Sequence, residues 1–153
     1  MAASSASTDL WGTLAAEAAA ESPLWGDALR AQPDRRPVFS PLAPERFALG
    51  LETIYEGYLL HYGRPRLFDP PDGDAALLLG DYLYAHGLVR VAALGEVEAV
   101  AALAELISTC AHLRAEGEDG DGEAWVDAAR RLGGEPEAAA VEQALASHAS
   151  RVG

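Results

Sequence analysis

Apolar residues recur at spacings of three and four along most of the chain, which is the periodicity of amphipathic helices. Alanine and leucine dominate and β-branched residues are sparse, a composition that favours helix over strand. The pattern therefore predicts an all-α fold without strands. The longer predicted helices span about 8–20, 45–62, 74–94 and 96–115, and two weaker ones span 124–132 and 136–150.

The segment 74–94, for which Asp72 or Asp74 is the expected N-cap, is apolar almost all round, which is typical of a helix buried in the middle of a bundle. Gly95 follows it at a position suited to a left-handed cap, and the next helix, 96–115, carries one polar and one apolar stripe. We expect these two helices to form a central buried antiparallel αα-hairpin within a helical bundle.

Prolines, glycines and helix-capping residues divide the chain into four parts. Residues 1–31 are predicted to form N-terminal helices, the second of them capped by Ser22 with Pro23 at its first position. Residues 32–44 hold four prolines and are predicted to be a linker or a surface strap. Residues 45–118 form the predicted helical core, and 119–153 hold the C-terminal helices and a polar tail.

Composition narrows the class of protein further. A length of 153 residues fits one domain, and a net charge of −13 argues against nucleic acid or an anionic membrane as a partner. The single cysteine, Cys110, excludes an intramolecular disulfide and suits a reducing compartment. The N-terminus does not resemble a secretory signal, and charged or ionisable residues interrupt the longest apolar stretch, so we expect a cytoplasmic protein without a membrane span.

Three short motifs carry a resemblance to a known family. They are Gly63-Arg64-Pro65, the run Leu77-Leu78-Leu79-Gly80-Asp81-Tyr82-Leu83, and Gly117-Glu118. Over residues 50–118 the chain resembles the trans-prenyltransferases, the polyprenyl diphosphate synthases of the class I isoprenoid synthase fold. The resemblance implies that the helical bundle is similar to part of that fold, and that an isoprenoid diphosphate is a candidate ligand.

The departures from this family concern its catalytic groups. Its enzymes hold Mg²⁺ on the substrate diphosphate with an Asp-rich motif, whereas the corresponding segment here, residues 50–66, contains no aspartate. All 11 cationic side chains are arginines, so the lysines that help to hold the diphosphates are absent. We therefore expect a catalytically silent relative, a pseudoenzyme that serves as an accessory subunit or binds an isoprenoid diphosphate.

Two alternatives stay open from the sequence. One is a residual synthase that completes its active site only as an oligomer, using Glu52, Glu56 and Arg64. The other is a generic α-helical interaction module in which the resemblance is accidental. The expected partners are a second copy of the chain or a subunit similar to a prenyl synthase, because a shortened bundle leaves part of its core face uncovered.

The candidate site residues follow from helical spacing. Glu52 and Glu56 lie one turn apart and could face one Mg²⁺ ion; the alternative is a solvated acidic face. Arg64 and Arg66 flank Pro65 and could contact a diphosphate; the alternative is pairing with nearby aspartates.

Tyr55, Tyr58 and Tyr62 share one helix face, either as bundle core or as the lining of a pocket for an isoprenoid chain. Asp81 lies in the most apolar helix, where a buried carboxylate is expected to orient neighbouring helices or, alternatively, to contact a ligand. The four histidines are too scattered to predict a zinc site.

Overall fold

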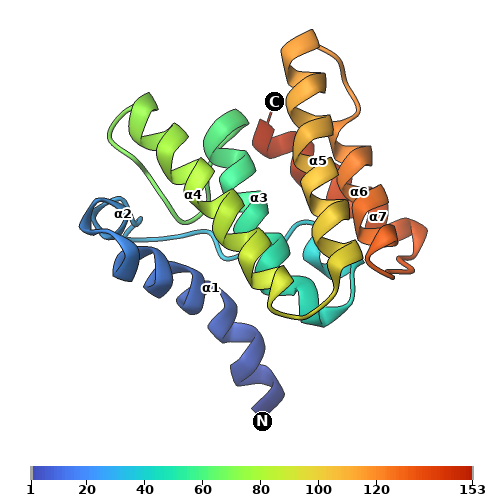
Figure 1. Cartoon of the computed structure of the whole chain (residues 1–153), viewed down its shortest axis with the longest axis horizontal. Coiled ribbons are helices and arrows are strands. Elements are labelled where there is room, and N and C mark those ends of the chain that lie inside the picture. The colour runs from blue at the N-terminus through green and yellow to red at the C-terminus, as the bar shows by residue number, and fades with distance from the viewer. Residues whose placement is uncertain (1, 153) are drawn as a thin grey trace.

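The structure is a computed structural model that describes the backbone of residues 2–152 and the side chains of residues 10–152. The described residues form seven α-helices and two short 3-10 helices and contain no strand, so the predicted all-α class is confirmed (Figure 1). The two end residues of the predicted N- and C-terminal parts, 1 and 153, lie outside the description. The elements are α1 (Ala2–Glu21), α2 (Pro23–Asp27), η1 (Ser40–Leu42), η2 (Glu45–Phe47), α3 (Ala48–Tyr62), α4 (Gly73–Ala92), α5 (Val97–Glu116), α6 (Asp121–Arg131) and α7 (Ala138–Val152).

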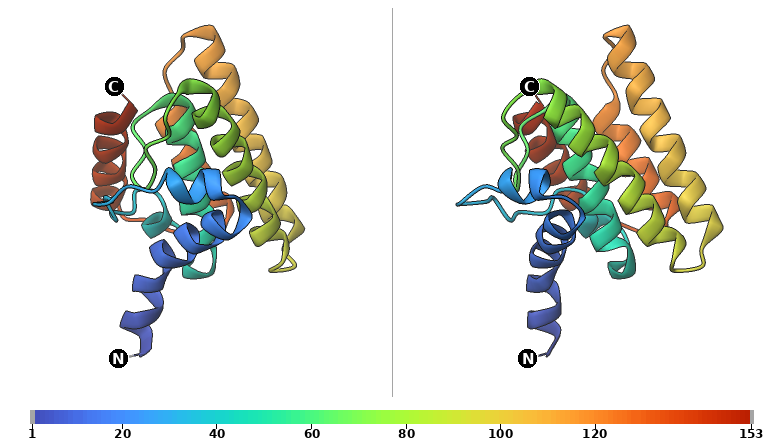
Figure 2. Two further views of the ribbon diagram at one scale, coloured as in Figure 1. Left: turned by 90° about the vertical axis from the view of Figure 1, so that its left-hand side faces the viewer. Right: turned by 60° about the vertical axis from the view of Figure 1, so that its left-hand side comes forward.

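Helix α3 is the centre of the molecule. Figures 1 and 2 show it between α4 on one side and the C-terminal helices α6 and α7 on the other. Every residue from 50 to 60 is buried, including Glu52, Thr53 and Glu56. The buried position that the sequence assigned to 74–94 therefore belongs to the preceding helix.

Helix α4 is covered on one face only, so the prediction that it is buried all round is wrong. Leu77, Leu78 and Val89 are 51%, 61% and 65% exposed. Its closest neighbour is α3, which runs antiparallel to it, so α3 and α4 rather than α4 and α5 form the central hairpin (Figure 1). Apolar composition shows that a helix can be buried, but the number of its faces that receive a partner depends on the other helices.

Four glycines bring α3 and α4 into close contact. They face each other in two pairs, Gly50 with Gly87 and Gly57 with Gly80, each seven residues apart along its own helix. A Cβ atom at Gly57 would lie 2.9 Å from the carbonyl oxygen of Gly80, and one at Gly87 would lie 3.2 Å from the carbonyl oxygen of Gly50. A larger residue at Gly57 or Gly80 would press on the facing backbone, and one at Gly50 or Gly87 would clash with the side chain of Val91 or Ile54.

Several local predictions are confirmed. The hydroxyl of Ser22 accepts a hydrogen bond from the Leu24 amide at the start of α2, and Asp72 caps α4 through the amide of Ala75. Gly95 has a φ of +79° in the turn between α4 and α5. The described part of the chain holds no helix with the length and apolar content that crossing a bilayer requires.

The proline-rich segment 32–44 is a strap rather than a free linker. Its Val38, Phe39 and Leu42 side chains are 3%, 1% and 3% exposed and belong to the main core. Backbone hydrogen bonds tie the strap and the residues just before it to the loop after α3: the Asp34 amide donates to the Arg66 carbonyl, and the Arg30 amide donates to the Leu67 carbonyl. The strap is thereby held against the side of α3, next to the α3–α4 loop.

Candidate functional site

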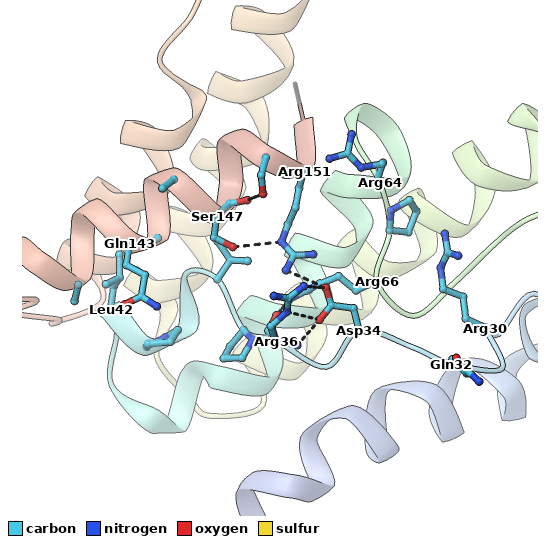
Figure 3. A pocket seen from close by; sticks show the side chains of 18 residues that line it. Arg30, Gln32, Asp34, Arg36, Leu42, Arg64, Arg66, Gln143, Ser147 and Arg151 are labelled. Atoms are coloured by element: carbon cyan, nitrogen blue, oxygen red, sulfur yellow. Dashed lines mark hydrogen bonds and ion pairs between the residues drawn. The ribbon is translucent and has the colours of Figure 1, made fainter.

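Three segments that are distant in sequence meet beside the C-terminal half of α3. They are the strap, the loop 63–69 and helix α7 (Figures 1 and 3). The amide of Asp34 donates to the carbonyl of Arg66, which joins the strap to the loop. The amide of Arg64 donates to the carbonyl of Arg151 at 2.9 Å, which joins the loop to α7.

Arg66 lies buried beneath the place where these three segments meet, and its side chain connects the loop to α3. Its side chain is 1% exposed and lies between Glu52 and Glu56, one helical turn apart on α3. Its guanidinium donates to Glu52 Oε1 at 2.6 Å, to Glu56 Oε1 at 3.0 Å and to the Arg36 carbonyl at 2.9 Å. The rings of Trp11 and Tyr55 lie 4.8 and 5.0 Å from the guanidinium carbon.

The second oxygen of each glutamate is also occupied. Glu52 Oε2 accepts the amides of Val38 and Ser40, and Glu56 Oε2 accepts the amides of Arg66 and Leu67. Burial acts to lower the pKa of Arg66, but the two carboxylate charges outweigh it, so this pKa lies above its usual range. The three side chains form one satisfied buried ion cluster that fastens strap and loop to α3.

This geometry changes the interpretation of Glu52 and Glu56. The alternative of a solvated acidic face is wrong, because both residues are 0% exposed. The carboxylates also do not fit Mg²⁺, since all four oxygens accept N–H donors and a guanidinium lies between them. Among the described residues, no group of three or more His, Cys, Asp or Glu side chains is arranged to hold a metal ion.

A cleft of about 1060 Å³ opens above this cluster (Figure 3). Five of the 11 arginines in the chain line it, together with one carboxylate, although the whole chain carries a net charge of −13. Its arginines are Arg30, Arg36, Arg64, Arg66 and Arg151, and the carboxylate is Asp34. The charge of Arg66 is matched by Glu52 and Glu56, so the other four arginines and Asp34 leave the cleft with an excess of positive charge on an acidic protein.

The arginines of the cleft differ in how they are paired. Within the side chains described, Arg30 and Arg64 make no ion pair, and both are exposed. Asp34 binds Arg36 through both carboxylate oxygens, at 2.9 and 3.0 Å, and lies 3.1 Å from Arg151. The hydrogen bond from Arg36 and the charge of Arg151 lower the pKa of Asp34 to about 2 against the opposing effect of burial.

The wall opposite the strap comes from α7. Ala140, Ala144 and Ser147 face the cleft from this helix, and Pro37, Pro41 and Leu42 add apolar surface from the strap and η1. The cleft thus has both guanidinium groups and an apolar wall (Figure 3).

A second buried polar cluster anchors α7. The Tyr55 hydroxyl lies 2.7 Å from Nδ1 of His148, whose Nε2 lies 2.8 Å from Oδ2 of Asp121. Asp121 also accepts hydrogen bonds from the Tyr58 hydroxyl at 2.5 Å and from Arg114 at 2.8 Å. These contacts join α7 to α3, α5 and α6 and thereby fix the position of the cleft wall.

The tyrosines predicted as site residues lie in this cluster and not in the cleft. Tyr55 and Tyr58 are 0% and 1% exposed and pack against the Trp125 ring, with centroids 5.1 and 5.9 Å apart. Tyr62 is half-buried, with the Arg114 guanidinium 5.4 Å from its ring. The bundle-core interpretation describes Tyr55 and Tyr58, whereas none of the three tyrosines lines the cleft.

The prediction of a buried Asp81 is wrong. Its side chain is 70% exposed on the uncovered face of α4, and its Oδ1 lies 3.1 Å from Nε2 of His61. Arg66 also differs from its predicted environment, since it is buried against Glu52 and Glu56 rather than paired with aspartates of an exposed loop. Arg64 is the predicted site residue that remains exposed in the cleft.

Sequence reasoning missed Arg30, Asp34, Arg36 and Arg151 as site residues. The available signal was the abundance of arginine around the prolines of the strap, in the run Asp34-Arg35-Arg36-Pro37. No periodicity connects this run to Arg151, which approaches it only because α7 folds back against the strap.

Comparisons with known proteins add no further assignment. No protein-family model, curated protein or solved structure matches the chain. The similarity to trans-prenyltransferases therefore stays a prediction from the sequence motifs.

Proposed function

We propose that this protein binds a multiply charged anion of the diphosphate type in the arginine-lined cleft and does not convert it. The observation that carries the proposal is the concentration of four arginines, besides the Arg66 that Glu52 and Glu56 neutralise, with one carboxylate in the lining of one cleft of a strongly acidic chain. A guanidinium presents parallel N–H donors that match the oxygens of a phosphate, so a group of arginines is suited to a polyanion.

The walls of the cleft indicate what else the ligand carries. Its volume of about 1060 Å³ lies near the upper end of the range for small-molecule sites, roughly 300–1,000 Å³. Pro41, Leu42 and Ala144 provide an apolar surface beside the arginines. An isoprenoid diphosphate, with an anionic head and a hydrocarbon chain, has this combination of chemistries. It is also the ligand class that the sequence resemblance implies.

The same geometry supports binding without turnover. Ionisation of an allylic diphosphate requires strong stabilisation of the leaving group, which metal ions commonly supply. Glu52 and Glu56, the carboxylates that a residual synthase would need, are engaged by Arg66 and backbone amides. Binding through guanidinium groups does not require a metal, so we expect it to persist in a chelator.

Calorimetric titration with pyrophosphate and with isopentenyl diphosphate, in EDTA at low ionic strength, tests the proposal. We expect saturable one-to-one binding that weakens at least tenfold in the Arg30→Ala, Arg64→Ala double variant. The matched control replaces Arg130 and Arg131, which lie outside the cleft, with alanine and thus removes the same charge. Absence of binding, or equal weakening in both double variants, would overturn the proposal.

Product analysis separates binding from catalysis. The protein is incubated with Mg²⁺, isopentenyl diphosphate and an allylic diphosphate, and we expect no elongated product. Turnover that disappears in Arg64→Ala would instead favour the residual synthase.

A second candidate function, an interaction module, is favoured by the uncovered apolar face of α4. Leu77, Leu78 and Val89 are exposed there on one helix. Mass measurement by light scattering across a concentration series tests it. Self-association that is lost in Leu78→Glu and retained in Leu24→Glu, an exposed leucine on α2, would support this function. A constant monomer mass with no co-purifying partner would count against it.

A further inference from the structure

Asp34 is paired with two of the arginines that line the cleft. It is the single carboxylate among the lining residues, all of which lie in the described part of the chain. Its Oδ1 accepts the Arg36 backbone amide and Nε, and its Oδ2 accepts a terminal nitrogen of the same guanidinium. Oδ2 also lies 3.1 Å from a terminal nitrogen of Arg151 on α7.

These donors are the ones that recognise phosphate in proteins. A two-point contact with one guanidinium, a backbone amide and a second arginine is a typical set for a phosphoryl group. The carboxylate of Asp34 therefore satisfies, from within the chain, the groups that could hold a ligand. Arg30 and Arg64, in contrast, have no such internal partner among the described side chains.

The contact between Asp34 and Arg36 can be exchanged at low cost. The Arg36 side chain is 79% exposed and that of Asp34 is 32% exposed, so water solvates both partners when they separate. Exposed ion pairs of this kind contribute little to stability. The Arg151 side chain is 10% exposed and stays in the cleft wall, so there the ligand must replace the carboxylate as its anionic partner. The buried cluster beneath them is independent of Asp34, because Arg66 is held by Glu52 and Glu56.

We infer that Asp34 is an internal competitor that a ligand displaces from Arg36 and Arg151, and that it thereby selects for polyanions. This inference rests on the proposed function of the cleft. A ligand with one negative charge only replaces the carboxylate that is already present. A diphosphate can contact Arg30 and Arg64 and also take over Arg36 and Arg151, so it gains contacts that Asp34 cannot make.

Two variants that remove one negative charge each provide the first test. Asp34→Asn keeps the size of the side chain and removes its charge, and Asp127→Asn removes an exposed carboxylate outside the cleft. We expect Asp34→Asn to bind pyrophosphate about fivefold more tightly and to acquire measurable affinity for monoanionic acetate, whereas Asp127→Asn behaves as the wild type. Thermal unfolding of each variant checks that it is folded.

A double-mutant cycle distinguishes displacement from repulsion at a distance. If the ligand must separate Asp34 from Arg36, the loss of affinity caused by Arg36→Ala is larger in the Asp34→Asn background than in the wild type. We expect the two losses to differ by about threefold or more. Equal losses in both backgrounds, or unchanged affinity in Asp34→Asn, would overturn the inference.

The two proposals fail in different ways. If neither the wild type nor Asp34→Asn binds pyrophosphate, the proposed function of the cleft is wrong. If the wild type binds pyrophosphate and the cycle is additive, the cleft is a binding site and only the role of Asp34 is wrong.

Discussion

The guanidinium of Arg66 lies 3.0 Å from Oε1 of Glu56, and neither side chain is exposed to solvent. Arg66 comes from a loop and Glu56 from the central helix, so this contact joins two segments of different kinds. Both partners have lost their hydration, and the pair is stable because Glu52 and backbone amides complete its hydrogen bonds.

Replacement of Arg66 by alanine is therefore expected to destabilise the fold strongly. It leaves Glu52 and Glu56 as buried charges without a counter-ion, and we expect a loss of about 3–5 kcal/mol in the free energy of unfolding. Urea denaturation followed by circular dichroism measures this change. Arg64→Ala, two residues away and exposed, is the matched control, with an expected change within about 0.5 kcal/mol. Similar losses in the two variants would contradict the role of Arg66 as the buried counter-ion.

The contact between α3 and α4 predicts that Gly57→Ala is destabilising. The added methyl group would lie 2.9 Å from the backbone oxygen of Gly80, so one helix must move, at a cost of about 1–3 kcal/mol. Gly12→Ala on α1 is the control, because no atom lies within 4 Å of its added Cβ. That variant is expected to gain about 0.5–1 kcal/mol from its higher helix propensity. Chemical denaturation of both variants shows whether the two signs differ.

The environment of the Asp121 carboxylate predicts that the fold loses stability in acid. Burial acts to raise its pKa, but hydrogen bonds from His148, Tyr58 and Arg114 outweigh burial and hold this pKa below its ordinary value of 3.8. A lowered pKa in the folded state stabilises the fold above pH 3.8, and this contribution disappears as the pH falls through the folded-state pKa.

We expect Asp121→Asn to lose about 3 kcal/mol at pH 7, because Arg114 and the Tyr55–His148 pair then lack their carboxylate partner. The difference between the variant and the wild type should shrink as the pH is lowered from 5 to 2, because below the ordinary pKa of 3.8 the unfolded wild type takes up a proton at Asp121 while the folded state still holds the carboxylate ionised, which favours unfolding. Urea midpoints measured across this pH range test the prediction. A difference that stays constant would show that the charge of Asp121 does not contribute.

The reactivity of the Cys110 thiol measures how readily the fold opens around α5. Burial raises its pKa to about 12, with a smaller contribution from the charge of Asp121, and the residue is 1% exposed. Thiolate is the reactive form, so Ellman's reagent at pH 8 is expected to label the native protein slowly and the urea-unfolded protein fully within the mixing time. Since the chain has one cysteine, the labelling rate reports one site. Rapid labelling of the native protein would contradict the buried position of Cys110 on α5.

Local signals predicted most of the secondary structure. The N-caps Ser22 and Asp72 and the left-handed Gly95 lie where their side-chain chemistry indicated. These features depend on contacts within a few residues, which the sequence displays directly. The all-α class follows from the same kind of information.

The identity of the central helix could not be predicted in this way. Helix α4 carries the longer uninterrupted apolar run, yet α3, with two glutamates, is the buried one. A glutamate on a helix is usually solvated, and Glu52 and Glu56 are buried only because Arg66 enters between them from the following loop. The spacing of seven between Gly50 and Gly57, and between Gly80 and Gly87, was a signal of close helix packing that hydrophobic periodicity does not detect.

The sequence by itself determined the helical class, most of the helix ends and the presence of an arginine pair around Pro65, because each depends on neighbouring residues. The start of α1 is an exception, since the helix begins at Ala2 and not at about residue 8 as predicted. Only the tertiary structure decided what those arginines do. It buries Arg66 as a counter-ion, leaves Arg64 in the cleft and brings Arg151 from the far end of the chain to Asp34. The reason is physical: a charge is neutralised, or left available for a ligand, according to the groups that surround it in space.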